Sequence, residues 1–329
     1  MNSIESDPRP AICRGWFYAL PALVLTVAVV CVAGCGGKEA IAPVERSNAV
    51  AAIDEATPFD LESIATVKRE GDAVTQVDFR NRQYNIDDIE QLSSHPAIKV
   101  VRFGGDSETR IDDDTMIIVG RLPKLKVLAI DNQNVTAAGL QSIANPAQIV
   151  ELYAANTSID DAVAGSIAAM TNLRKVRLAG TQIGAETLAA LAQLPELTTI
   201  DISGCPGVTD DAIKPLANAA KLQSLNVYDT PLSADAASTF SKVATLTSLN
   251  VDKTGFDDAS ASKITALPLT FLHLGSTRVT DAAAEALVKI ETLERLIVTR
   301  TGMTQAGVDV IAAANPDCEI QLQYVPPAR

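Results

Sequence analysis

The stretch LRKVRLAGTQIGAETLAALAQLPEL at residues 173–197 carries two hydrophobic periods in succession. Its first six residues have apolar side chains at positions 1, 4 and 6, and the last two alternate as in a short strand with one buried face. Its second half has leucines at helical spacing: Leu188, Leu191 and Leu194. The stretch therefore predicts a short strand followed by a helix.

The same pattern recurs along most of the chain. Eight copies, 23 to 25 residues apart, begin at Leu125, Ile149, Leu173, Leu197, Leu222, Leu246, Leu269 and Leu293. Two weaker copies begin at Val74 and Ile98, and a stub at 320–322 closes the series. One unit is too small to bury its own apolar face, so ten units and a partial one predict a solenoid in which stacking supplies the core.

The pattern LxxLxLxxTxIT, followed by an amphipathic stretch ending in LP, resembles the leucine-rich repeat over about residues 73–323. The resemblance implies an α/β fold, a right-handed horseshoe with a parallel sheet on the concave side and helices on the convex side. The copy at 197–217 has Cys205 where other copies have threonine. That copy resembles the cysteine-containing subtype found in F-box-associated repeat proteins.

Polar residues recur at fixed positions between each strand and its helix. A threonine whose hydroxyl can close the turn stands at Thr157, Thr181, Thr230, Thr254, Thr277 and Thr301. Residues of helix N-cap type follow at Asp160, Thr209, Ser233, Asp257, Thr280 and Thr304. Acidic pairs at these positions are interpreted as caps and partners of the helix dipole, because the alternating Asp/Asn pattern of a calcium loop is absent.

The N-terminus has the features of an export signal. Arg9 and Arg14 precede an apolar run at 16–33, and the sequence VAGC at 32–35 resembles the lipobox of bacterial lipoproteins. The resemblance implies a lipidated Cys35 and cleavage just before it. The alternative is an uncleaved transmembrane helix, because eighteen apolar residues can barely span a bilayer. Both interpretations predict a membrane-anchored, extracytoplasmic protein of the bacterial cell envelope.

The predicted domain organisation follows from these features. Residues 1–34 form the signal peptide, and 35–57 the lipidated cysteine and a flexible spacer. Residues 58–72 form an N-terminal capping helix, 73–323 the repeat domain and 324–329 a tail.

In leucine-rich-repeat proteins the ligand usually docks on the concave strand face. The outward-pointing strand positions nominate ten partner-binding residues: Arg102, Tyr153, Lys175, Arg177, Asp201, Asn226, Asn250, Phe271, His273 and Arg295. Arginine and aromatic side chains commonly carry binding energy at interfaces. The predicted partner is a protein or a glycan, and the alternative is that these are ordinary solvated sheet residues.

Composition and motifs argue against other classes of function. The 329 residues carry a formal net charge of −13, which disfavours a nucleic-acid partner. No catalytic or nucleotide-binding motif occurs, and His95 and His273 lie in distant repeats, so we expect no enzyme activity, no metal and no cofactor. Cys205 and Cys318 are predicted to be buried thiols.

Two other functions compete with a binding module. The first is a structural envelope protein that self-associates through its repeats. The second is a substrate-recognition adaptor resembling F-box leucine-rich-repeat proteins in ubiquitin ligation. The adaptor would need an F-box helix bundle, for which the sequence before Val74 has no room.

Overall fold

The computed structural model describes residues 60–105 and 108–323. Every described residue belongs to one compact unit, which Thr57–Arg329 delimits. The predicted signal peptide, lipidated Cys35, spacer and tail lie outside the described residues. Among the residues described, no helix has the length and apolar character needed to cross a membrane.

The repeat domain is built on one twelve-stranded sheet whose strands follow the order of the sequence. Ten strands, one per predicted repeat, are β2 Ala73–Asp78, β3 Val100–Arg102, β4 Val127–Ala129, β5 Glu151–Tyr153, β6 Lys175–Arg177, β7 Thr199–Asp201, β8 Ser224–Asn226, β9 Ser248–Asn250, β10 Phe271–His273 and β11 Arg295–Ile297. The stub forms β12, Glu319–Gln321. Strands β2 to β12 are all parallel, which confirms the predicted sheet.

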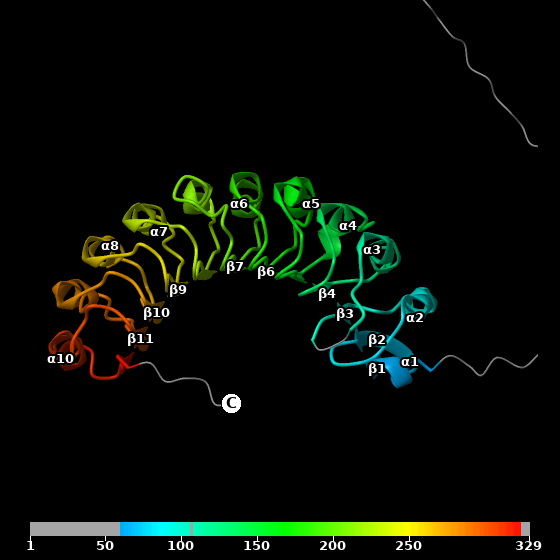
Figure 1. Cartoon of the computed structure of the whole chain (residues 1–329), viewed down its shortest axis with the longest axis horizontal. Coiled ribbons are helices and arrows are strands. Elements are labelled where there is room, and N and C mark those ends of the chain that lie inside the picture. Colours follow the sequence, from blue (N-terminus) through cyan, green and yellow to red (C-terminus); the bar gives the residue numbers. More distant parts are fainter. Residues whose placement is uncertain (1–59, 106–107, 324–329) are drawn as a thin grey trace, which may run out of the picture. The chain divides into compact units, whose positions relative to one another are not determined.

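Short helices lie on the outer side of the repeat domain and the strands on its inner side (Figure 1). The α-helices are α1 Leu61–Ile64, α2 Ile86–Glu90, α3 Asp113–Val119, α4 Ala137–Gln141, α5 Ala164–Ala169, α6 Ala185–Ala192, α7 Ala237–Phe240, α8 Asp258–Lys263, α9 Ala284–Leu287 and α10 Gln305–Ala314. The 3-10 helices are η1 Gln91–Ser94, η2 Pro146–Gln148, η3 Asp161–Val163, η4 Lys214–Asn218, η5 Ala234–Ala236 and η6 Asp281–Ala283.

The core fills the space between the two layers. Leu188, Leu191 and Leu194 of the opening stretch are buried, as are Val176 and Leu178 of its strand. Each repeat contributes the same positions, so the apolar core is continuous from β2 to β11.

The predicted capping helix over 58–72 is wrong in its secondary structure. Helix α1 covers only Leu61–Ile64, and residues Thr66–Glu70 form strand β1, which pairs antiparallel with β2. Leu61 is buried against the core, and Ile64 and Val67 are partly buried there, so these side chains still cover the end of the solenoid. Residues Thr66–Glu70 form a strand and not a helix because the backbone of β2 offers a free edge for pairing.

Each repeat turns away from its strand through one residue with left-handed backbone, three residues past the strand. These residues have φ between +52° and +71° and are Asn81, Gly105, Asn132, Asn156, Gly180, Gly204, Asp229, Lys253, Ser276 and Arg300. The threonine that follows in six repeats donates its hydroxyl to the carbonyl oxygen three residues earlier, at 2.5–2.8 Å. The predicted role of these threonines is confirmed.

Five of the six predicted N-caps are confirmed. Asp160, Ser233, Asp257, Thr280 and Thr304 each accept a hydrogen bond from a first-turn amide. The sixth residue, Thr209, accepts only a 3.3 Å bond from the amide of Ala212, and the next helical turn of that repeat is η4, beginning at Lys214.

In five repeats, the aspartate that follows the cap position has a role the sequence analysis missed. Its carboxylate reaches forward and accepts a hydrogen bond of 2.7–3.0 Å from the amide of the cap residue in the next repeat. The pairs are Asp113–Thr136, Asp161–Gly184, Asp210–Ser233, Asp258–Thr280 and Asp281–Thr304. These aspartates therefore link successive repeats, and all of them except Asp210 also lie in the first turn of a helix.

Candidate functional site

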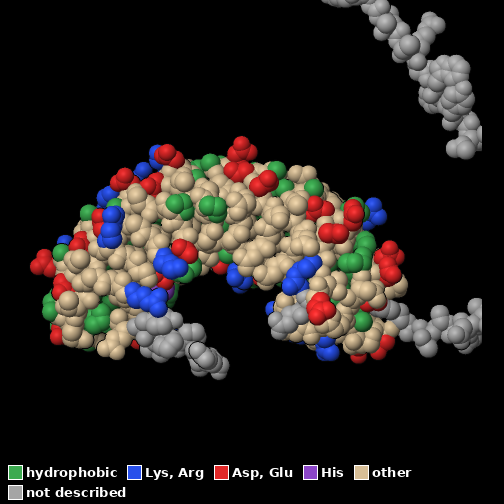
Figure 2. Space-filling view, viewed as in Figure 1, with side chains coloured by type: hydrophobic (Ala, Val, Ile, Leu, Met, Phe, Trp, Pro, Cys, Tyr) green, Lys and Arg blue, Asp and Glu red, His purple; other side chains and the backbone are tan. Residues whose placement is uncertain are grey.

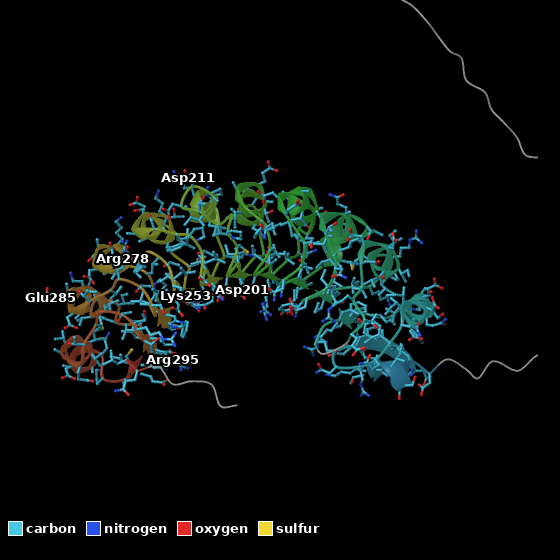
Figure 3. All side chains as sticks on the ribbon, in the orientation of Figure 1. Asp201, Asp211, Lys253, Arg278, Glu285 and Arg295 are labelled. Atoms are coloured by element: carbon cyan, nitrogen blue, oxygen red, sulfur yellow. The ribbon has the colours of Figure 1, made fainter. Side chains whose placement is uncertain are left out.

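Outward-pointing side chains form columns across the concave face because the strands pair without a shift in register. Arg102 pairs with Ala129, Ala129 with Tyr153, and Tyr153 with Arg177. All ten residues predicted for this face are at least partly accessible to solvent. Asp201 and Arg295 lie on the strand side, whereas Glu285 lies on the helix side (Figure 3).

A third column of positions lies one residue past the last buried apolar residue of each strand segment, and its side chains are accessible in some repeats and buried in others. It includes Arg80, Asp131, Tyr228 and Asp252, which the sequence analysis did not nominate. The alternation of the strand continues for one more residue, which is the signal that could have found them. Lys and Arg side chains line the inner edge of the repeat domain in Figure 2.

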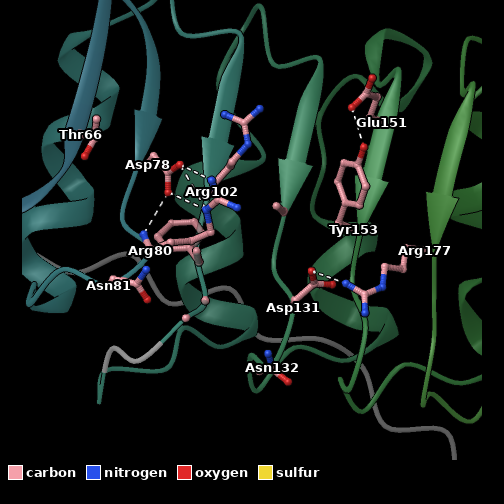
Figure 4. Close-up of a pocket in the computed structure, with 14 residues that line it drawn as sticks. Thr66, Asp78, Arg80, Asn81, Arg102, Asp131, Asn132, Glu151, Tyr153 and Arg177 are labelled. Atoms are coloured by element: carbon pink, nitrogen blue, oxygen red, sulfur yellow. Dashed lines mark hydrogen bonds and ion pairs between the residues drawn. The ribbon is translucent and has the colours of Figure 1, made fainter. Parts of the chain in front are cut away.

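The first half of the concave face carries a network of charge pairs. Arg80 binds Asp78 through two nitrogen atoms, with Nη2 at 2.6 Å from Oδ2 (Figure 4). Burial works to raise the pKa of Asp78, but hydrogen bonds from Arg80 and the charges of Arg80 and Arg102 lower it below its ordinary value. Asp78 is therefore a carboxylate at neutral pH, held by its neighbour.

Arg177 lies between two acidic residues of other repeats. Its Nη1 is 3.3 Å from Asp131 Oδ2, and its Nε is 3.3 Å from Asp201 Oδ2. Asp131 also accepts a 2.6 Å hydrogen bond from the amide of Ala155. The structure thus brings the predicted residues Arg177 and Asp201 together and adds Asp131 to them.

The side chain of Tyr153 is positioned by Glu151, which lies two residues earlier on β5. The tyrosine hydroxyl donates a 2.8 Å hydrogen bond to Glu151 Oε2, and Lys175 Nζ lies 3.6 Å from Glu151 Oε1. Burial, and then the hydrogen bond to Glu151, raise the pKa of Tyr153 to about 12. The phenol therefore stays neutral and presents a half-buried ring to the concave side.

These residues surround a hollow of about 840 Å³ on the concave side. Its lining comprises Thr66, Asp78, Arg80, Asn81, Arg102, Phe103, Gly104, Gly105, Ala129, Asp131, Asn132, Glu151, Tyr153 and Arg177. Ala129 explains why the face is hollowed here, because its methyl group stands between the long side chains of Arg102 and Tyr153.

In the second half of the concave face, the side chains of the predicted residues Asn226 and Asn250 form hydrogen bonds with the backbone. Asn226 accepts a 3.1 Å hydrogen bond from the amide of Tyr228, and Asn250 a 3.0 Å bond from that of Asp252. Asp201 does the same with Ser203. These side chains close the turn after the strand, so their oxygen atoms are committed locally.

The last repeats bring together the remaining predicted residues. Phe271 and His273 are neighbours on β10, with ring centroids 6.4 Å apart. His273 Nε2 lies 3.6 Å from Asp252 Oδ2, and burial lowers the pKa of His273, so the imidazole is neutral at pH 7. Arg295 Nε is 3.8 Å from Glu319 on β12.

The described residues hold no group of three or more His, Cys, Asp or Glu side chains arranged for a metal ion. Cys205 is fully buried and free, and burial raises the pKa of its thiol. Cys318, also free, is only partly buried, so the prediction of a buried thiol is confirmed for Cys205 and wrong for Cys318. The thiol of Cys318 lies near the end of the sheet, where no further repeat packs over it within the described residues.

A parallel sheet, one strand and one outer helical segment per repeat, and a repeated turn define a leucine-rich-repeat solenoid. Solved structures share this fold. Internalin C2 of Listeria monocytogenes aligns at a TM-score of 0.51 with 18% identity, over 64% of this chain and 84% of that one. PEPR1 from the PEPR1–AtPEP1 structure and a TDR receptor each align at 0.50 with 13% identity. These alignments cover 79% and 77% of this chain, and 36% and 43% of the two receptors.

The likeness establishes the fold alone, because all three identities are low. No protein-family model matches the sequence, and no curated protein matches it either.

Proposed function

We propose that this chain is a non-catalytic binding protein that captures a protein partner on the first half of its concave face. The observation that carries the proposal is the hollow around Ala129, where charged and aromatic side chains from five neighbouring repeats converge. Arginine and tyrosine are the residue types that most often dominate interface energies. The PEPR1–AtPEP1 structure shares the fold and supports a protein partner rather than a glycan.

The proposed location is the bacterial cell envelope, with the repeat domain held outside the cytoplasm by a lipidated Cys35. The lipobox-like sequence at 32–35 and the preceding apolar run support this anchor. Metabolic labelling with a clickable fatty acid in a bacterial host tests it. We expect label on the wild type and none on Cys35→Ala, and label on neither would contradict lipidation.

Site-specific photo-crosslinking tests the binding face. A benzophenone amino acid in place of Tyr153 should give one discrete adduct in the native membrane. The same group in place of Glu285, which is exposed on the outer helix α9, should give none. Reversing the charges of Arg102 and Arg177 together should abolish the adduct.

The matched control is Lys214→Glu, because Lys214 is 68% exposed on the helical side and should leave the adduct unchanged. Equal adducts from both crosslinker positions would rule out the concave face. An adduct that contains only peptides of this chain would identify the self-associating envelope protein instead, and a carbohydrate adduct would identify a glycan partner.

A further inference from the structure

A notch in the concave face lies between Arg102 on β3 and Tyr153 on β5. The two residues occupy the same register position with Ala129 of β4 between them. At the usual strand spacing their Cα atoms are about 10 Å apart. Ala129 is 7% exposed and forms the floor, so the walls are a guanidinium on one side and an aromatic ring on the other.

Each carboxylate that lines the notch has a direct partner, whereas Arg102 has none among the described residues. Asp78 is bound by Arg80, Asp131 by Arg177, and Glu151 by the hydroxyl of Tyr153 and by Lys175. Within residues 60–105 and 108–323, the guanidinium of Arg102 makes no hydrogen bond and no ion pair. Its charge acts on Asp78 and on Tyr153 only through space.

The unpaired guanidinium of Arg102 determines which chemical group of a ligand the notch can bind. A carboxylate matches the fork of a guanidinium and can accept two parallel hydrogen bonds from it. A dianionic phosphate fits less well, because Asp78, Asp131 and Glu151 line the same hollow and repel the second charge. The ring of Tyr153 and the methyl group of Ala129 offer apolar contact for the carbon atoms beside the carboxylate.

We propose that the notch is the anchor site for one acidic side chain of the protein partner, with an Asp or Glu carboxylate on Arg102 and its methylene groups against Tyr153 above Ala129. This inference rests on the proposed function, since it names the part of the partner that the concave face recognises.

A peptide library tests the inference directly. Random 12-residue peptides displayed on phage are selected on the full chain in mild detergent, and enriched peptides are synthesised with a fluorophore. We expect the enriched peptides to share one Asp or Glu. Replacing that residue by Asn or Gln, or making Arg102→Gln, should each weaken binding by roughly tenfold or more. The two changes combined should lower the peptide's affinity little further than either change alone.

Two matched variants separate this site from the rest of the face. Ala129→Leu fills the notch without changing charge and should abolish binding, whereas Ser248→Leu, at a partly accessible position of β9 on the same face, should not. Unchanged thermal unfolding of each variant establishes that the fold is intact.

The outcomes distinguish the two proposals. Peptides that need Arg102 and an open notch but bind equally well after their acid is neutralised overturn the carboxylate anchor and leave concave-face binding standing. Peptides lost only with Ser248→Leu place the binding site in the other half and also overturn the anchor. Peptides insensitive to every concave variant, or no enriched peptide at all, overturn the anchor and the proposed function together.

Discussion

The carboxylate of Asp161 accepts a 2.7 Å hydrogen bond from the amide of Gly184, the N-cap residue of helix α6 in the next repeat. Gly184 has no side chain with which to cap its helix. Asp161 replaces that cap from outside, and it also accepts a 3.1 Å bond from the amide of Thr187. One side chain thus joins two repeats and satisfies amides that the helix leaves open.

Asp161→Ala should therefore destabilise the repeat domain by about 1–2 kcal/mol, the usual cost of losing a helix cap. The measurement is the free energy of unfolding in urea. Glu291→Ala is the control, because Glu291 is exposed and makes no hydrogen bond within the described part of the chain. Equal stability of the two variants would mean that solvent replaces the contribution of Asp161.

Acid should weaken the same link. Burial works to raise the pKa of Asp161, but hydrogen bonds from the 184–187 segment lower it below the ordinary value. The pKa values of the cap residues Asp112 and Asp257 are lowered by bonds from their own first turns. A lowered folded-state pKa means that the stabilisation is complete above the unfolded-state pKa, near 3.9, and is lost as the pH falls through the folded-state pKa.

Urea midpoints measured from pH 6 down to pH 2.5 check this dependence. We expect a constant midpoint in the upper part of the range and a steep fall below about pH 4. Asp161→Asn should reduce the size of the fall, because the variant has no carboxylate to protonate there. A fall of the same size in the variant would assign the acid sensitivity to other groups.

Replacing glycine by alanine should have opposite effects on stability at two positions, Gly180 and Gly165. Gly180 has φ +67°, and a Cβ atom there would meet Asn156 Oδ1 at 2.3 Å. Gly180→Ala should destabilise by at least about 1–2 kcal/mol, the cost of left-handed backbone for a residue with Cβ. Gly165 lies in α5, where an added Cβ meets nothing within 4 Å.

Gly165→Ala should stabilise by about 0.5–1 kcal/mol, because alanine loses less backbone entropy in a helix. Thermal unfolding of both variants beside the wild type makes the comparison. A stabilised Gly180→Ala would show that the turn can adopt another backbone conformation.

The two described cysteines should differ in reactivity. Cys205 is 0% exposed and its thiol contacts the carbonyl oxygen of Leu178 at 3.1 Å, whereas Cys318 is partly accessible. Burial raises the pKa of both thiols, so a larger fraction of each thiol stays protonated at pH 8. Cys318 nevertheless remains accessible to the reagent.

Iodoacetamide at pH 8, followed by peptide mass spectrometry, checks this difference. Cys318 should be alkylated in the folded chain, and Cys205 only after unfolding in urea. Rapid alkylation of Cys205 in the native chain would mean that its repeat opens locally.

The class of fold, the number of repeats and the side chains that face the core could be predicted from the amino-acid pattern alone. This prediction is possible because a repeat of about 24 residues with alternating and then helical apolar spacing can bury its leucines only by stacking. Parallel stacking also fixed the columns of the concave face, so the accessibility of Arg102 and Tyr153 was predictable.

The spacing of apolar residues does not encode contacts between different repeats, and only the folded chain shows these contacts. Strand β1 replaced the expected helix because its partner edge on β2 is a property of the folded sheet. The partners of Arg177 come from repeats on either side of it, and the link from Asp161 to Gly184 spans two repeats. Arg102 and Arg177 look alike in the sequence, and only the neighbours supplied by folding make one a paired charge and leave the other open to a ligand.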